Sequence, residues 1–134
     1  MVILFDQFNM SEDIFTVIFA TEQQVIVAKV LIDFMKTNGG TLNKTEMSFL
    51  ANQLHEGKYE TFVDVPNFKG KKVKLAYNKR QFYDRILTPM KSMGLVKYDL
   101  YEKTYSIDES FNRLMVRIGM MWISELKKKP IPQN

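Results

Sequence analysis

The chain of 134 residues is 46% hydrophobic and has a formal net charge of +4, a size and composition that suffice for one compact core. It contains no cysteine, which excludes a disulfide framework, a thiolate zinc site and a cysteine nucleophile. No apolar run approaches the roughly 18 residues that a membrane span requires, and the first residues lack the basic region of a secretory signal. We therefore expect a single domain, residues 1–134, in a cytoplasmic protein with no membrane contact.

The positive charge is concentrated in the middle of the chain. Residues 56–103 contain 11 Lys or Arg and 6 Asp or Glu, a net charge of +5, whereas the remainder contains 8 and 9, a net charge of −1. A basic region on a nearly neutral scaffold is typical of a protein that binds a polyanion, although lysine-rich surfaces also occur in other proteins. The charge pattern favours nucleic acid as a partner.

Residues 22–37 are predicted to form the first long helix, after an N-terminal flanking segment, residues 1–20. Thr21 and Gln24 have the spacing of a capping box, and Gly39 follows the segment as a helix stop. Many β-branched residues argue for a strand instead. The segment is long, however, and its apolar residues continue at helical spacing, so a helix is the better prediction.

A second capping box, Asn43 with Glu46, begins a shorter helix that is predicted to end near His55. His55 is the sole histidine, so a Ser-His-Asp triad or a conventional metal cluster would have to rely on one residue at a helix end. A glycine-rich phosphate loop is also missing from the sequence. We therefore expect His55 to be a surface residue and the chain not to be an enzyme, with no catalytic residue, metal or cofactor.

A third capping box, Asn78 with Gln81, begins a helix whose apolar residues lie on one side and which ends at Gly94. Pro89 lies inside this helix and removes one backbone hydrogen bond. We expect a kink or a break near Thr88.

Two short strands are predicted after Gly94. The segments LVKYDL, residues 95–100, and KTYSI, residues 103–107, have strand character and are separated by Tyr101 and Glu102. Together they predict an antiparallel hairpin that follows the third helix.

Residues 56–77 are predicted to form another β-hairpin. The flanks YETFVDV and KKVKLAY have strand character, and Pro66, Asn67 and Gly70 supply a turn. Two interpretations stay open, a second arm that contacts DNA phosphates and a charged loop that keeps the protein soluble. The lysines of this hairpin form a dense basic patch: Lys69, Lys71, Lys72 and Lys74.

The C-terminal helix is predicted over residues 108–129, before a short tail, residues 130–134. Asp108 or Ser110 is expected to cap it, and its terminal lysines suit the negative end of the helix dipole. Its broad apolar stripe either closes the core or pairs with a second copy, and the breadth of the stripe favours a homodimer. The predicted dimer interface consists of Phe15, Phe19, Phe111, Leu114, Ile118, Met121 and Trp122.

The stretches TEQQVIVAKVLIDFMKTNGGTLNKTEMSFLANQL and YDRILTPMKSMGLVKYD carry a resemblance to a known fold. Residues 21–107 resemble a winged-helix (winged helix-turn-helix) domain of prokaryotic and archaeal transcription regulators, including the multiple-antibiotic-resistance regulator type. The resemblance implies a mainly α fold with a small antiparallel β part (α+β), in which flanking N- and C-terminal helices surround the winged helix. The hairpin at 56–77 departs from the pattern of the family as an insertion.

The resemblance also implies sequence-specific binding of double-stranded DNA. The third helix would lie in the major groove, and the hairpin of residues 95–107, which corresponds to the wing of the family, would contact the DNA backbone. Two other functions stay open, a winged-helix module for protein contacts and a replication or maintenance protein of a plasmid or virus. Candidates that face the groove are Lys79, Arg80, Gln81, Asp84, Arg85 and Thr88. Candidates nearer the backbone are Lys91, Lys97 and Lys103.

Overall fold

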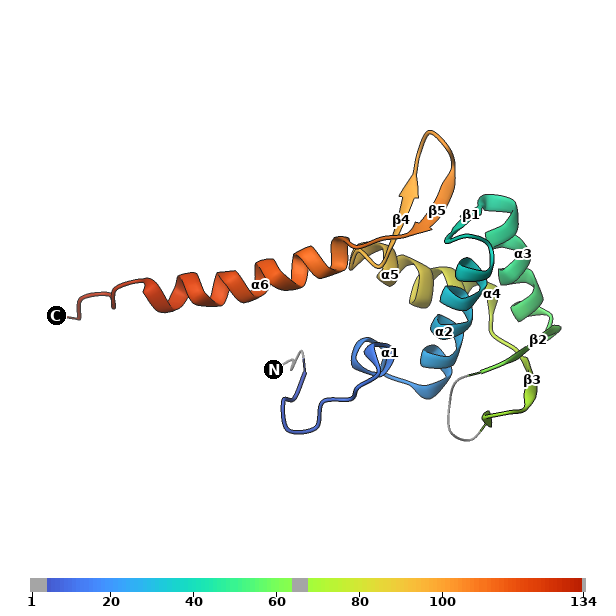
Figure 1. The fold of residues 1–134 in the computed structure, drawn as a ribbon, viewed down its shortest axis with the longest axis horizontal. Coiled ribbons are helices and arrows are strands. Elements are labelled where there is room, and N and C mark those ends of the chain that lie inside the picture. The colour runs from blue at the N-terminus through green and yellow to red at the C-terminus, as the bar shows by residue number, and fades with distance from the viewer. Residues whose placement is uncertain (1–4, 64–67, 134) are drawn as a thin grey trace.

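The computed structural model describes residues 5–63 and 68–133 of the chain (Figure 1). It is mainly helical with two small antiparallel sheets, which confirms the predicted α+β fold class. Its elements in chain order are α1 (Ile14–Ile18), α2 (Glu22–Thr37), β1 (Thr41–Asn43), α3 (Lys44–His55), β2 (Tyr59–Phe62), β3 (Lys72–Leu75), α4 (Lys79–Gln81), the π-helix η2 (Phe82–Leu87), α5 (Thr88–Ser92), β4 (Val96–Asp99), β5 (Thr104–Ile107) and α6 (Ser110–Lys127).

Helix α2 spans the predicted residues and forms the centre of the core. The segment forms a helix despite its many β-branched residues, because it contains more apolar residues than one face of a strand could bury. Val27, Ala28, Leu31 and Met35 are almost completely inaccessible to solvent. Phe19 is also buried in this core, at 8% exposure. The prediction that Phe19 belongs to a dimer interface is therefore wrong for the described fold, because its ring is already covered within the chain.

Only one of the three predicted capping boxes is complete. In α3, the Asn43 side chain accepts a hydrogen bond from the N–H of Glu46, and the Glu46 carboxylate accepts one from the N–H of Asn43. Thr21 and Asn78 each accept a hydrogen bond from the third residue of their helix. In the described part of the chain, Gln24 and Gln81 return no such bond, so these two caps are single hydrogen bonds.

A three-stranded antiparallel sheet in the order β1-β5-β4 contains the predicted wing. Strands β4 and β5 are shorter than predicted, because Leu100 and Lys103 belong to the turn. Strand β1, which was not predicted from the sequence, pairs Leu42 with Tyr105. Three residues are too few to show the alternation that predicts a strand, and β1 exists because β5 pairs with it.

The third helical segment consists of α4, η2 and α5, and it continues through Pro89 without a break. The N–H of Thr88 donates to the carbonyl of Tyr83, five residues earlier, which is the hydrogen bond of a π-helix. Because Pro89 lacks an N–H, a widened turn precedes it, and the predicted break does not occur. Phe82, Ile86 and Met90 are fully buried, as their spacing predicts.

The predicted insertion is a two-stranded hairpin that precedes the third helical segment. Tyr59 pairs with Leu75 and Phe62 with Lys72. The predicted turn residues Pro66 and Asn67 lie outside the described residues. In Figure 1 this hairpin lies at the N-terminal end of the third helical segment, and the wing formed by β4 and β5 lies at its C-terminal end.

Helix α6 extends away from the rest of the molecule (Figure 1). It contains no buried residue, so the interpretation that it closes the core is wrong. The predicted caps are also wrong, because the N-cap residue is Glu109 and its side chain forms no capping hydrogen bond. Ser110 instead donates its hydroxyl proton to the Asp108 carboxylate.

Candidate nucleic-acid interface

The exposed side of the third helical segment carries most of the residues predicted to face a DNA groove. Arg80, Asp84, Arg85 and Thr88 are exposed, whereas the remaining two candidates, Lys79 and Gln81, are half-buried. The Arg80 Nε atom lies 3.6 Å from the Asp84 carboxylate, one helical turn away. An exposed pair of this kind is weak, so Arg80 can exchange this partner for a base or a phosphate at little cost.

The start of the third helical segment is held by the sole histidine. His55 is exposed at the end of α3, as predicted, and its Nδ1 atom accepts a hydrogen bond of 3.1 Å from the N–H of Lys79. This bond links the end of α3 to the start of the third helical segment, which the inserted hairpin separates in sequence. The role was not predicted from the sequence, because it depends on how two helix ends meet.

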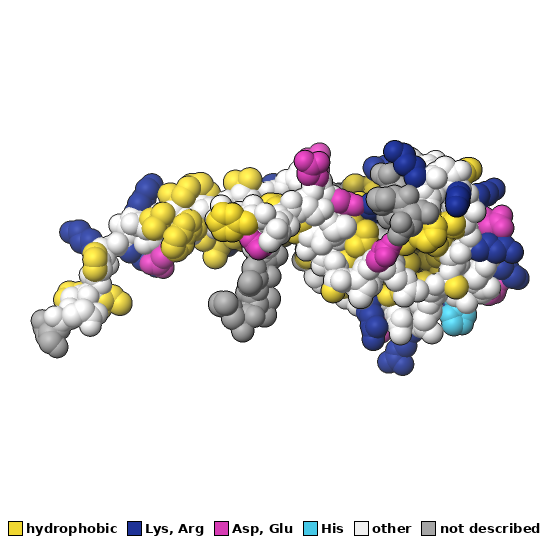
Figure 2. All heavy atoms as spheres, turned by 90° about the horizontal axis from the view of Figure 1, so that it is seen from below, with side chains coloured by type: hydrophobic (Ala, Val, Ile, Leu, Met, Phe, Trp, Pro, Cys, Tyr) yellow, Lys and Arg dark blue, Asp and Glu magenta, His cyan; other side chains and the backbone are white. Residues whose placement is uncertain are grey.

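The inserted hairpin presents its lysines to solvent at the N-terminal end of the third helical segment. Lys69, Lys71, Lys72 and Lys74 are all exposed. The Lys74 ammonium group lies 3.9 Å from the carboxylate of Glu60, its register partner, so part of its charge is offset. Figure 2 shows that Lys and Arg side chains lie over the end of the molecule opposite α6.

The wing turn is held in one conformation by Asp99. Its carboxylate accepts hydrogen bonds from the N–H groups of Tyr101 and Glu102, at 2.8 and 3.0 Å. These bonds hold the pKa of Asp99 below its ordinary value. Lys103 closes the turn with a φ of +55° and donates its N–H to the carbonyl of Asp99. Tyr101 at the tip is 96% exposed.

A cluster of tyrosines and lysines that was not predicted as a unit lies at the base of the wing. Tyr98 and Tyr105 are register partners, and their ring centroids lie 4.7 Å apart. The Lys44 ammonium group, at the start of α3, lies 5.6 Å from the Tyr98 centroid. Lys91 of α5 lies 6.0 Å from the Tyr98 centroid and 5.8 Å from that of Tyr105. We call these four residues the wing cluster.

The wing cluster adjoins the third helical segment through Tyr83, which is half-buried. Burial raises the pKa of Tyr105, and the neighbouring phenols of Tyr83 and Tyr98 raise it further. The Tyr105 hydroxyl therefore stays protonated at neutral pH and can donate a hydrogen bond.

The structure separates two lysines that were predicted to act together. Lys91 belongs to the wing cluster, whereas Lys97 lies on the opposite face of β4 from Tyr98, since side chains alternate along a strand. The Lys97 charge lowers the pKa of Asp99 and that of Asp108, in each case to a smaller extent than hydrogen bonds do. Lys97 thus has acidic neighbours and faces away from the wing cluster.

The described residues form neither a metal site nor a membrane span. Among residues 5–63 and 68–133, no three His, Asp or Glu side chains are grouped so that they could hold a metal ion. Within the same ranges, no helix has the length and apolar character needed to cross a membrane.

Comparison of the chain with protein-family models, with curated proteins and with solved structures found no match. The function of the chain therefore has to be inferred from its own geometry.

Proposed function

We propose that this protein binds double-stranded DNA sequence-specifically with a winged-helix fold and acts as a transcription regulator. The observation that carries the proposal is the sheet order β1-β5-β4 combined with the helix order α2, α3 and the third helical segment. A winged helix has this arrangement, in which the third helix is exposed beside the wing. The exposed face of that helix is charged, which suits DNA better than an apolar protein partner.

In this proposal the third helical segment enters the major groove. Arg80 and Arg85 are exposed, and a guanidinium group can bind guanine in a bidentate manner; the half-buried Gln81 has the amide that pairs with adenine. The inserted hairpin and the wing contact the backbone on either side, and their lysines supply sequence-independent affinity.

We further propose a homodimer formed by α6. Its apolar side chains are exposed along the whole helix, with Ile118 at 47%, Met121 at 61% and Trp122 at 63%. Phe111 and Leu114 lie on the same side at helical spacing. Figure 2 shows hydrophobic side chains gathered along this helix. An exposed apolar surface of this extent is typical of a protein interface.

A second copy of α6 in antiparallel orientation fits this stripe. Pairing about a two-fold axis near Gly119 sets Phe111 of one copy opposite Leu126 of the other. Nothing lies within 4 Å of a Cβ built at Gly119, so the helix backbones can approach closely there.

The test is a titration of the full chain against random duplex DNA, single-stranded DNA and fragments selected from a random pool, each at two salt concentrations. We expect duplex binding at low salt and retention of a selected fragment at the higher salt, since direct readout survives screening better than phosphate contacts do. If no duplex binds at low salt, DNA binding is wrong and a protein-interaction module becomes the better interpretation.

A further inference from the structure

The wing cluster holds positive charge that no carboxylate offsets. Within the described ranges, neither Lys44 nor Lys91 forms an ion pair, whereas Arg80 is paired with Asp84 and Lys74 with Glu60. Both ammonium groups of the cluster lie near the same ring, that of Tyr98. Two cations held around one ring repel each other, and an anion bound between them removes this repulsion.

The tyrosine rings restrain the two lysines without neutralising them. An ammonium group over an aromatic face at an exposed site is weakly attracted to the ring. Because the side chain is already restrained, it loses less conformational freedom when it binds a ligand. A carboxylate at the position of the ring would have neutralised the ammonium charge. The aromatic ring leaves this charge available for an anionic ligand.

The tyrosine hydroxyls add neutral hydrogen-bond donors. In the part of the chain that the structure describes, no residue accepts a hydrogen bond from the hydroxyl of Tyr98 or Tyr105. Both rings are half-buried, so the cluster is covered on one side by protein and is accessible on the other. Two ammonium groups and two hydroxyls match the oxygen acceptors of a phosphate group.

We propose that the wing cluster binds a phosphate group of the DNA backbone, with Lys44 and Lys91 as the charged contacts and the hydroxyls of Tyr98 and Tyr105 as donors. This proposal rests on the DNA binding proposed above and adds a contact that joins three elements, the start of α3, the end of the third helical segment and the wing. Lys91 follows Thr88 along the exposed side of that segment. A phosphate bound here lies at the edge of the groove that this side enters.

The experiment measures binding of the full chain to a random-sequence duplex of about 20 base pairs over a range of salt concentrations. We expect Lys44→Ala and Lys91→Ala each to lower the slope of log affinity against log salt, and the double variant to lower it by up to about 0.9, the contribution of one neutralised phosphate. Tyr98→Phe and Tyr105→Phe remove a neutral donor only. We expect them to weaken binding about 3- to 10-fold and to leave the slope unchanged. Lys36→Ala, which removes an exposed charge from α2, is the matched control.

Three outcomes are distinguishable. Reduced slopes for Lys44→Ala and Lys91→Ala, beside an unchanged slope for Lys36→Ala, support the wing cluster. Slopes for the cluster variants that equal that of Lys36→Ala overturn it, while duplex binding by the unaltered chain stands. A failure of the unaltered chain to bind duplex at low salt overturns DNA binding itself, and the wing cluster with it. Circular dichroism shows whether each variant is folded, and if a tyrosine variant is not, the lysine slopes decide.

Discussion

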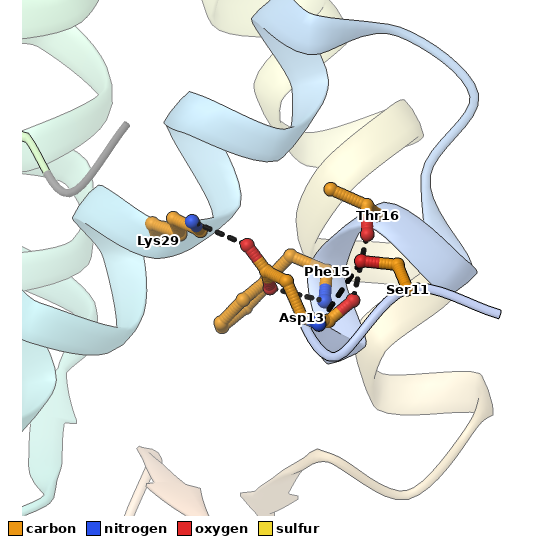
Figure 3. A network of polar contacts seen from close by, with 5 residues as sticks. All are labelled: Ser11, Asp13, Phe15, Thr16 and Lys29. Carbon is orange, nitrogen blue, oxygen red and sulfur yellow. Dashed lines mark hydrogen bonds and ion pairs between the residues drawn. The ribbon is translucent and has the colours of Figure 1, made fainter. Parts of the chain in front are cut away.

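At the scale of single residues, Asp13 joins the N-terminal segment to the core (Figure 3). Its carboxylate accepts a hydrogen bond of 2.9 Å from the N–H of Phe15 at the start of α1, and it forms an ion pair with Lys29 of α2. Burial raises the pKa of Asp13, but the hydrogen bonds from Lys29 and Phe15 outweigh burial, so this pKa lies below its ordinary value of 3.8. The ionised carboxylate therefore stabilises the packing of α1 on α2.

This pair predicts a pH-dependent loss of stability in Asp13→Asn. Asparagine is a comparable N-cap, so the substitution mainly removes the charge. We expect the free energy of unfolding to fall by about 1 kcal/mol at neutral pH, since the pair is partly exposed. A carboxylate with a lowered folded pKa contributes above its unfolded pKa and loses this contribution as the pH falls through the folded pKa. The difference from the unaltered chain should therefore shrink as the pH falls through the folded pKa of Asp13, which lies below 3.8.

Urea unfolding between about pH 3 and 7 measures this effect. Glu12→Gln, a change at the exposed neighbouring carboxylate, is the control for removing a negative charge from this segment. A constant difference between Asp13→Asn and the unaltered chain across this range would exclude the charge as the cause.

Residue-level predictions from sequence were most reliable where the interaction is local, and even there they were incomplete. Thr21, Asn43 and Asn78 each accept the hydrogen bond that a spacing of three residues predicts, but only Glu46 returns one. The wing cluster joins residues from α3, α5, β4 and β5, and its members become neighbours only after the sheet has paired. No spacing along the chain marks such a cluster.

At the scale of elements, Gly94 determines how the third helical segment connects to α6. Its φ is +83°, and a Cβ built there would lie 2.8 Å from the backbone nitrogen of Phe111. The N–H of Phe111 also donates to the carbonyl of Gly94, at 3.0 Å. The glycine was predicted as a helix stop, but the close approach of α6 is a second requirement that the sequence does not reveal.

Gly94→Ala should therefore lower the free energy of unfolding by about 3 kcal/mol, because a strained φ and a backbone clash add. Gly39→Ala is the matched control, since Gly39 also follows a helix with a positive φ, of +76°, but has no atom within 4 Å of the added Cβ. We expect about 1 kcal/mol for the control, the cost of the left-handed conformation alone. Equal losses in chemical denaturation would contradict a tight junction at Gly94.

The inserted hairpin makes its own prediction about DNA. Lys71→Ala, Lys72→Ala and Lys74→Ala combined should flatten the dependence of log affinity on log salt by up to about 0.9 for each lysine that binds a phosphate. The contribution of Lys74 to this change in slope should be smaller than that of Lys71 or Lys72, because Glu60 already offsets part of its charge. Alanine at Lys127, Lys128 and Lys129, which lie at the far end of α6, removes the same charge as a control. An unchanged slope in the hairpin variant would favour the interpretation of a solvated charged loop.

At the scale of the whole molecule, the sequence predicted the elements better than their relation to one another. The breadth of the apolar stripe in α6 favoured an interface over core closure, and the helix indeed contains no buried residue. The same reasoning assigned Phe19 to that interface, although its ring is buried beside α2. Apolar periodicity identifies a surface that needs covering, but it does not distinguish cover by the same chain from cover by another.

The dimer proposal can be tested with one charged residue placed inside or outside the apolar stripe of α6. Ile118→Asp introduces a charge in the stripe, whereas Ser124→Asp introduces it about 120° away around the helix, outside the stripe. At micromolar concentration, we expect the unaltered chain and Ser124→Asp to sediment at twice the monomer mass of 15.8 kDa. Ile118→Asp should sediment as a monomer, because burying an unpaired carboxylate between two helices is strongly unfavourable.

The sole tryptophan supplies an independent measurement. Trp122 is 63% exposed in the single chain and lies in the predicted interface, so its fluorescence maximum should shift to shorter wavelength as the protein concentration rises. This shift should be absent in Ile118→Asp. Monomer mass for the unaltered chain, with an emission maximum that does not depend on concentration, would exclude a dimer through α6. Each copy would then have to bind DNA alone, and a two-fold symmetric site would not be required.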